Sequence, residues 1–180
     1  MNTMQTRPAG FTLIELMVTL SVLAILLTIG IPSLQMFIQN SRLQSQSASL
    51  MGDLNYARAE AVRLGSPVAV CASADGATCS GALTWETGWV VFNDINNPPN
   101  NVVDAGELLR AAPALGGGNT LRAANPLVRF NALGYSNGFG ATFSVCDTRG
   151  LGNARGVILS NHGRVRSGKA TDAGFGTVAC

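Results

Sequence analysis

Sixteen consecutive residues without a charged side chain, Leu16–Ile31, constrain this chain more than any other feature. Counted from Phe11, the apolar stretch would form an α-helix of about 31 Å, close to the thickness of the hydrocarbon core of a bilayer. The sequence therefore predicts a membrane-spanning helix over residues 11–31. Glu15 lies within this segment, where a carboxylate costs roughly 2.5–3.5 kcal/mol near the bilayer centre, so its presence calls for a function.

Two simpler interpretations of this segment fit less well. A cleaved secretory signal has a shorter apolar run that ends in a small-residue cleavage site, whereas here Pro32-Ser33-Leu34-Gln35 follow a long run. A plain membrane anchor leaves Glu15 unexplained unless its side chain extends to the membrane surface. Neither interpretation uses both the length of the run and its carboxylate.

The residues around the start of the run, Arg7-Pro8-Ala9-Gly10-Phe11-Thr12-Leu13-Ile14-Glu15-Leu16-Met17-Val18, closely resemble the class III signal of type IV pilins and type II secretion pseudopilins. The resemblance implies that residues 1–10 are a leader peptide. A prepilin peptidase would cut between Gly10 and Phe11 and methylate the new amino terminus at Phe11. That amino group would then be a cationic partner for Glu15, and a buried charge with a partner is tolerable.

The same resemblance implies where the protein works and with what. The precursor would be a single-pass protein of the inner membrane with its globular domain in the periplasm. After cleavage it would enter an extracellular pilus or a periplasmic pseudopilus, with the 11–31 helix in the filament core. Its partners would then be the prepilin peptidase, the inner membrane and other major and minor pilins.

Helical patterning continues beyond the apolar run, and Pro32 is expected to kink or loosen the helix next to Gly30. Apolar residues then recur at spacings of four and three, which predicts one buried stripe; these residues are Leu50, Leu54, Ala57, Ala61 and Leu64. Gly65-Ser66-Pro67 supplies a stop signal. The helix is therefore predicted over residues 11–64, roughly 80 Å in length.

After Gly65 the pattern changes to short runs rich in β-branched and aromatic residues, separated by Gly, Asn, Pro and Asp clusters, which indicates antiparallel sheets. The expected strands are 68–72, 89–93, 108–112, 127–130, 142–146, 157–160 and 164–166. The last two would form a hairpin through Asn161-His162-Gly163, since Asn and Gly tolerate positive φ.

Three groups of residues resemble the soluble domain of the GspH/FimT class of minor pilins and pseudopilins. They are Trp89-Val-Val-Phe92-x-Asp94, Asp104-x-Gly106-Glu107-Leu-Leu-Arg110, and Arg155-Gly156-Val157 followed by Gly163-Arg164. The resemblance implies an α+β fold, with a long N-terminal helix packed on a β-sandwich of two small sheets. Residues 65–180 would form the globular β-rich domain.

The four cysteines, Cys71, Cys79, Cys146 and Cys180, would lie outside the cytoplasm, where an even number favours two disulfides. Three pairings are possible, of which we favour the sequential one, Cys71–Cys79 with Cys146–Cys180. A zinc site is the competing interpretation, but no C-x2-C spacing occurs and the chain has one histidine, so we expect no metal.

Catalytic and cofactor motifs are lacking in the sequence. The acidic segment from Asp94 to Glu107 resembles a calcium loop in composition, but Pro99 stands where an EF-hand needs Gly, so a polar loop held by Asx turns is favoured. The segment Gly150–Gly156 resembles the dinucleotide-binding motif G-x-G-x-x-G, but its last glycine stands one residue too late in the chain. With one histidine and no acid pair near a base, we expect no enzyme, no cofactor and no small-molecule substrate.

Charge is unevenly distributed along the chain. Residues 64–109 carry five acids and no Lys or Arg, whereas residues 110–180 carry seven Arg and one Lys against two Asp, a net charge of +6. In one strand Arg164 and Arg166 would share a face while Val165 turns to the core. Guanidinium groups bind phosphate oxygens through paired hydrogen bonds, which suggests a DNA-binding strand; its candidate residues are Arg164, Arg166, Lys169, Arg155 and Arg149.

The Gly163-Arg164-Val165-Arg166 arrangement is also similar to that of FimT-type minor pilins, which bind DNA during natural transformation. The resemblance implies a minor pilin whose basic C-terminal region captures extracellular DNA, and we expect this DNA to be duplex and bound without sequence preference. Three alternatives remain: a charged edge strand that prevents aggregation, a minor pilin that only primes or caps the pilus, and a pseudopilin of type II secretion.

Overall fold

The computed structural model of this protein describes residues 10–96, 98–172 and 180. The chain divides into two compact units, one ending at Gln39 and the other running from Asn40 to Cys180. A single helix, α1 (Leu13–Leu64), contributes to both units. The first unit is the N-terminal part of this helix, and the second is an α+β domain.

The helix of the first unit is long and apolar enough to cross a membrane. All its side chains from Leu13 to Ile38 are exposed, as expected for a surface that contacts lipid or other subunits. The helix begins at Leu13, two residues later than predicted, and it continues as α-helix through Pro32.

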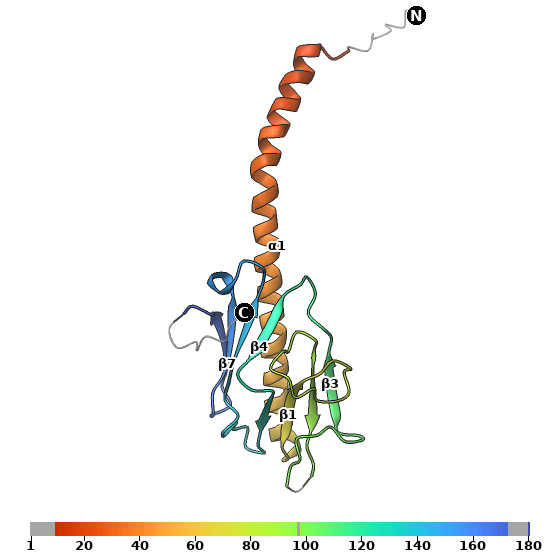
Figure 1. Ribbon diagram of the computed structural model, residues 1–180, viewed down its shortest axis with the longest axis vertical. Helices are drawn as coiled ribbons and strands as arrows, with labels where there is room; N and C mark the ends of the chain where they lie inside the picture. The colour runs from red at the N-terminus through yellow and green to blue at the C-terminus, as the bar shows by residue number, and fades with distance from the viewer. Residues whose placement is uncertain (1–9, 97, 173–179) are drawn as a thin grey trace, which may run out of the picture. The chain divides into compact units, whose positions relative to one another are not determined.

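The second unit contains two four-stranded antiparallel sheets and residues 40–64 of α1 (Figure 1). The first sheet has the strand order β3-β2-β1-β5, formed by β1 (Val68–Ala72), β2 (Trp89–Asn93), β3 (Leu108–Ala112) and β5 (Leu127–Phe130). The second has the order β4-β6-β7-β8, formed by β4 (Thr120–Ala123), β6 (Ala141–Cys146), β7 (Arg155–Leu159) and β8 (Val165–Lys169), with a short 3₁₀ helix η1 (Leu151–Asn153) before β7.

One hydrophobic core joins the helix to both sheets. Leu50, Leu54, Ala57 and Ala61 of the predicted stripe are fully buried, whereas Leu64, at the end of the helix, is 38% exposed. Residues of β1, β2 and β5 meet this stripe from one sheet, and residues of β4, β6 and β7 meet it from the other. The predicted buried stripe is therefore confirmed except at Leu64, which lies outside the hydrophobic core at the end of the helix.

The strand predictions need four corrections. β4 was not expected; it is short and pairs with β6 along Thr120–Ala123. β6 starts one residue earlier than predicted, and β7 covers Arg155–Leu159 instead of 157–160. β8 covers Val165–Lys169, so Arg164 lies in the turn before the strand. The other four predicted strands have the expected bounds.

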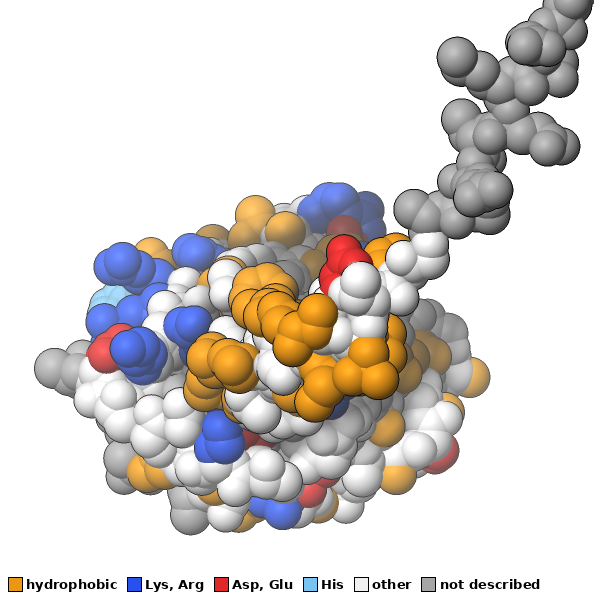
Figure 2. All heavy atoms as spheres, turned by 90° about the horizontal axis from the view of Figure 1, so that it is seen from above, with side chains coloured by type: hydrophobic (Ala, Val, Ile, Leu, Met, Phe, Trp, Pro, Cys, Tyr) orange, Lys and Arg blue, Asp and Glu red, His pale blue; other side chains and the backbone are white. Residues whose placement is uncertain are grey.

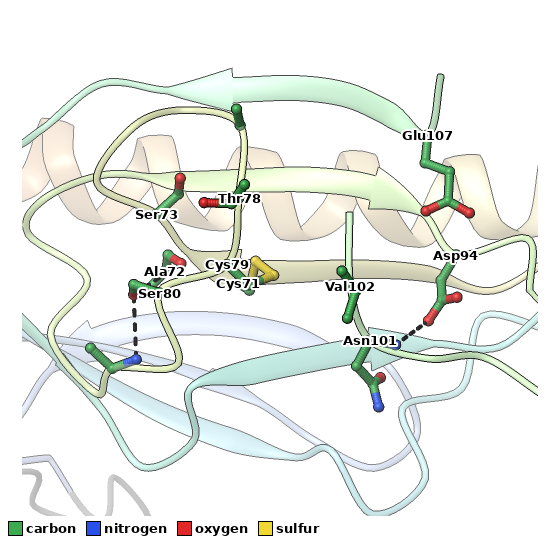
Figure 3. The surroundings of a disulfide bond; sticks show 12 residues. Cys71, Ala72, Ser73, Thr78, Cys79, Ser80, Asp94, Asn101, Val102 and Glu107 are labelled. Carbon is green, nitrogen blue, oxygen red and sulfur yellow. Dashed lines mark hydrogen bonds between the residues drawn. A yellow bond between two sulfur atoms is a disulfide. The ribbon is translucent and has the colours of Figure 1, made fainter. Parts of the chain in front are cut away.

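The outer face of the first sheet is covered by loops that the acidic segment and one disulfide hold in place (Figure 3). Cys71 of β1 is bonded to Cys79. The buried Asp94 carboxylate accepts hydrogen bonds from the backbone N–H groups of Asn100 and Asn101, at 3.2 and 2.9 Å. The similarly buried Glu107 accepts from the N–H groups of Ile95 and Asp104, at 3.0 Å each.

These bonds give the acidic segment a structural role. Side-chain amides of Asn96 and Asn100 donate to Asp104 and lower the pKa of its carboxyl group. Within the described residues, no three His, Cys, Asp or Glu side chains are grouped so that they could hold a metal ion. The carboxylates of Asp94 and Glu107 instead satisfy backbone donors of their own loop, and this fixes the loop over the sheet.

Candidate nucleic-acid interface

The β7–β8 hairpin carries most of the predicted cationic site. Its strands pair from Arg155↔Lys169 to Leu159↔Val165. The turn continues the ladder, since the N–H of Ser160 donates to the Arg164 carbonyl at 3.0 Å and the N–H of Gly163 donates to the Ser160 carbonyl at 2.8 Å. Gly163 has φ +74°, which favours glycine, so the predicted turn at Asn161-His162-Gly163 is confirmed.

The tip of this hairpin is held against the rest of the domain. Gly163 packs so closely on Gly134 that a Cβ atom built at Gly163 would lie 2.0 Å from the Gly134 carbonyl oxygen. The same oxygen accepts a hydrogen bond from Nε of Arg58, on α1, at 3.1 Å. Asn161 adds a second connection, because its carbonyl accepts from the N–H of Ser136 at 2.9 Å. These contacts fix the position of the turn and therefore of the side chains that it carries.

Arg164 and Arg166 share one surface of the hairpin. Together with Ile158, Ser160 and His162 they line a hollow of about 380 Å³. Arg166 lies directly opposite Ile158 in the ladder, and both arginines are exposed. Figure 2 shows Lys and Arg side chains grouped beside the chain's single histidine. Although Arg164 precedes β8, the predicted pairing of Arg164 and Arg166 on one face holds.

The hollow also contains groups that the sequence did not single out. His162 is exposed at the turn, and the Ser160 hydroxyl accepts a hydrogen bond from the backbone N–H of Arg164 at 3.2 Å, so its own proton is available for donation. From the sequence, Ser160 and His162 could have been found only by their even spacing from Ile158 and Arg164, because residues two apart in a strand share a face. Val165 is partly buried against the core, as predicted.

Arg155 and Lys169 form a second pair at the other end of the hairpin. They are direct partners in the ladder, and they line a hollow of about 200 Å³ with Asn40, Gly152 and Asn153. Along β7, Arg155 lies on the same face as the core residue Val157 and on the opposite face from Ile158. Arg155 and Lys169 therefore lie on the opposite side of the ladder from Arg166.

Arg149 is engaged in an ion pair. Its guanidinium lies 2.6 Å from an oxygen of Asp147 and also donates to the side-chain oxygen of Asn40 at 2.9 Å. The hydrogen bond from the Arg149 guanidinium holds the pKa of Asp147 below its usual value. The five predicted cations are thus not one cluster: they divide into a pair around the turn, a pair beside Asn40, and one internal ion pair.

Cys146 of β6 is bonded to Cys180, so the structure contains the sequential disulfide pairing. Cys146 is buried in a small cluster with Ala154 and Ala170. The N–H of Ala170 donates to the carbonyl of Ala154 at 3.0 Å, which extends the β7–β8 pairing toward this disulfide. The tail between them, residues 173–179, lies outside the described residues.

The predicted processing site lies at the start of α1. Gly10 and Phe11 are exposed and precede the helix. Thr12 and Glu15 form a reciprocal pair: the Thr12 hydroxyl accepts from the N–H of Glu15 at 3.3 Å, and the Glu15 carboxylate accepts from the N–H of Thr12 at 3.5 Å. This capping box explains why the helix begins at Leu13, and the T-x-x-E spacing could have predicted it.

Comparison with known proteins agrees with this arrangement. The family described as type II transport protein GspH matches residues 46–163, and the prokaryotic N-terminal methylation motif matches residues 6–31. This chain belongs to the GspH family. No significant match was found among curated protein sequences.

Solved structures of a minor pilin and a minor pseudopilin share the fold. The type IV minor pilin FimU of Pseudomonas aeruginosa is 22% identical, with a TM-score of 0.57 over 76% of this chain and 95% of FimU. The minor pseudopilin EpsH of the type 2 secretion system of Vibrio cholerae is 12% identical, with a TM-score of 0.50 over 73% of this chain and 99% of EpsH. The GspH-family protein described here is therefore a minor pilin or pseudopilin, and its family and fold are those of structural proteins. Its apolar N-terminal helix and methylation motif fit a membrane-anchored pilin.

Proposed function

We propose that this GspH-family protein is a FimT-like minor pilin that binds extracellular DNA for uptake during natural transformation. The observation that carries the proposal is the hollow at the hairpin tip, where Arg164 and Arg166 stand beside the Ser160 hydroxyl and the His162 imidazole. Guanidinium groups and hydroxyls are the usual donors to DNA phosphates. Phosphate contacts carry no sequence information, so we expect binding to duplex DNA with little sequence preference.

The other three cations have supporting roles in this proposal. Arg149 is committed to Asp147, and Arg155 and Lys169 lie on the opposite side of the ladder. They raise the positive potential of the domain, which accelerates encounter with DNA, but the direct contacts are assigned to Arg164 and Arg166.

The test is the salt dependence of binding of residues 40–180 to a labelled duplex, measured by fluorescence anisotropy. With two phosphate contacts, made by Arg164 and Arg166, log affinity should fall with log salt with a slope of about −1.8. Changing Arg164 and Arg166 to Gln together should flatten the slope by about two and abolish measurable binding near physiological salt.

The chain offers a matched control for this experiment. Changing Arg155 and Lys169 to Gln removes the same two charges from the other side of the hairpin, and most of the slope should remain. In cells, the Arg164/Arg166 variant should lose DNA uptake while pili stay visible. If that variant bound DNA like the wild type, the arginines would serve solubility, and the pilus-priming alternative would take first place.

The proposal includes maturation at the start of the chain. A prepilin peptidase would cut between Gly10 and Phe11 and methylate Phe11, and the globular domain would stand on the periplasmic side. Cleavage frees the Phe11 amino group for pairing with Glu15, whose carboxylate caps the helix before cleavage. Mass spectrometry of filament-incorporated protein should show a methylated Phe11 terminus, and an intact Met1 there would contradict this.

A second candidate function is a pseudopilin of type II secretion, which the fold shared with EpsH favours. Such a protein would contact exported proteins instead of DNA. Deletion of the gene distinguishes the two: loss of secreted enzymes with unchanged transformation would support the pseudopilin, and the opposite result would support the DNA-binding pilin.

A further inference from the structure

The hollow beside Asn40 belongs to the part of the domain that directly follows the apolar segment of α1 in the chain. Asn40 is the first residue of the compact domain, and the apolar, exposed side chains of α1 continue to Ile38. From Ile31, where a 21-residue span from Phe11 ends, nine helical residues lead to Asn40, about 13 Å along the axis. The headgroup layer occupies roughly 5–7 Å of that distance.

The two cations of this hollow are available to a ligand. Within residues 10–96, 98–172 and 180, neither the guanidinium of Arg155 nor the ammonium of Lys169 has a hydrogen-bond or ion-pair partner. Asp147 is neutralised by Arg149. Asp172 accepts a hydrogen bond from the backbone N–H of Lys169 at 3.0 Å, which leaves the ammonium itself unpaired.

The hollow has the size and the donors that a phosphate group needs. Its volume is about 200 Å³, and it is lined by Arg155, Lys169, Asn40 and the loop at Gly152 and Asn153. An arginine offers a paired set of donors to phosphate oxygens, and a lysine adds a point charge.

We propose that Arg155 and Lys169 bind the headgroup phosphate of an anionic phospholipid while the protein is anchored in the membrane. This contact would hold the domain against the bilayer until the subunit leaves it for the filament. The proposal rests on the membrane-spanning helix and is independent of DNA binding, which is assigned to the other side of the hairpin. DNA shares the phosphate chemistry, so it is included as a separate arm of the test.

The experiment uses the full chain, ¹⁵N-labelled, in non-ionic maltoside micelles to which phosphatidylglycerol is added in steps. We expect saturable shifts of the backbone amide signals of Gly152, Arg155 and Lys169. Changing Arg155 and Lys169 to Gln should weaken the apparent affinity roughly 30-fold, since each cation near an anionic surface contributes about fivefold. The matched variant with Arg164 and Arg166 changed to Gln should respond like the wild type, and unshifted core signals in both variants would show that they are folded.

Three further arms identify the source of the phosphate. Phosphatidylcholine, which has the same phosphate but no net charge, and inorganic phosphate at equal concentration should both give much weaker responses at these amides. Duplex DNA should shift the signals of Arg164 and Arg166 and leave that of Gly152 in place. The proposal is overturned if phosphatidylglycerol causes no saturable shift, if the Arg155/Lys169 variant responds like the wild type, or if DNA shifts Gly152 where the lipid does not.

Discussion

Replacing Asp53 with alanine should destabilise the domain, because it removes a buried polar link between α1 and the first sheet. The Asp53 carboxylate, which is 7% exposed, joins the helix to two strands of the first sheet. It accepts hydrogen bonds from the indole N–H of Trp89, at 2.9 Å, and from the guanidinium of Arg110, at 2.7 Å. The guanidinium also lies 4.0 Å from the centre of the Tyr56 ring, and its bond to Asp53 raises the pKa of Arg110.

The expected cost follows from the burial of the two donors. Trp89 is 1% exposed, and an indole N–H left without a partner there costs about 1–3 kcal/mol. The Arg110 side chain is 47% exposed, so loss of its ion pair adds less than about 1 kcal/mol. Alanine returns about 0.5 kcal/mol as a better helix former. The net destabilisation by Asp53→Ala should therefore be about 1–3 kcal/mol.

The assay is urea unfolding of residues 40–180 at pH 7, followed by far-ultraviolet circular dichroism. Asp53→Asn is the matched control: its amide oxygen can still accept from the indole, so its cost should stay near 1 kcal/mol or below. In a Trp89→Phe background, which lacks the N–H donor, Asp53→Ala should also cost only about 1 kcal/mol. The reasoning fails if Asp53→Ala costs less than about 0.5 kcal/mol, or if its cost is the same in both backgrounds.

Three further changes test other parts of the domain. Replacing Cys146 and Cys180 with Ser should lower the free energy of unfolding by roughly 3–4 kcal/mol, because the disulfide closes a loop with a sequence separation of 34; a loss below about 1 kcal/mol in urea unfolding would contradict the loop-entropy reasoning. Gly163→Ala should lower the free energy of unfolding by at least about 2 kcal/mol and weaken DNA binding, since the φ of +74° and the contact with Gly134 exclude a Cβ atom. Calorimetry and fluorescence anisotropy on one sample measure the two effects, and an unchanged melting temperature would contradict this prediction. Asp147→Asn should destabilise at pH 7 but much less at pH 3: the arginine partner lowers the pKa of this carboxyl group, so its stabilisation is complete above the unfolded-state pKa near 4 and is lost as pH falls through the folded-state value. An equal difference at the two pH values would refute the assignment.

The sequence predicted the elements whose signal is local. The apolar run and the 4-3-4-3 stripe from Leu50 place α1, because helix periodicity is visible within one turn. Runs such as 68–72 and 89–93 gave their strands with the correct bounds, since their β-branched and aromatic residues match a buried sheet. β4 was missed because Thr-Leu-Arg-Ala is short and has little strand propensity of its own; pairing with β6 makes it a strand.

The candidate site was predicted only in part, for the same reason. Strand alternation correctly predicted that Arg164 and Arg166 lie on one face. This prediction requires only that side chains two residues apart in an extended chain point the same way. The placement of Arg155 and Lys169 on the far side needed the hairpin register, and their neighbour Asn40 is more than a hundred residues away in the chain.

By itself, the sequence determined that this chain has an apolar helix long enough to cross a membrane, an N-terminal methylation motif, a buried helix stripe and a basic C-terminal region. These features depend on composition and on spacings of a few residues, which local geometry converts directly into structure. Only the tertiary structure decided that Asp53 meets Trp89, that Asp94 and Glu107 hold a loop, and that the cations divide between two sides of one hairpin. Such contacts join residues far apart in the chain, and they exist only because burial of the common core brings those segments together.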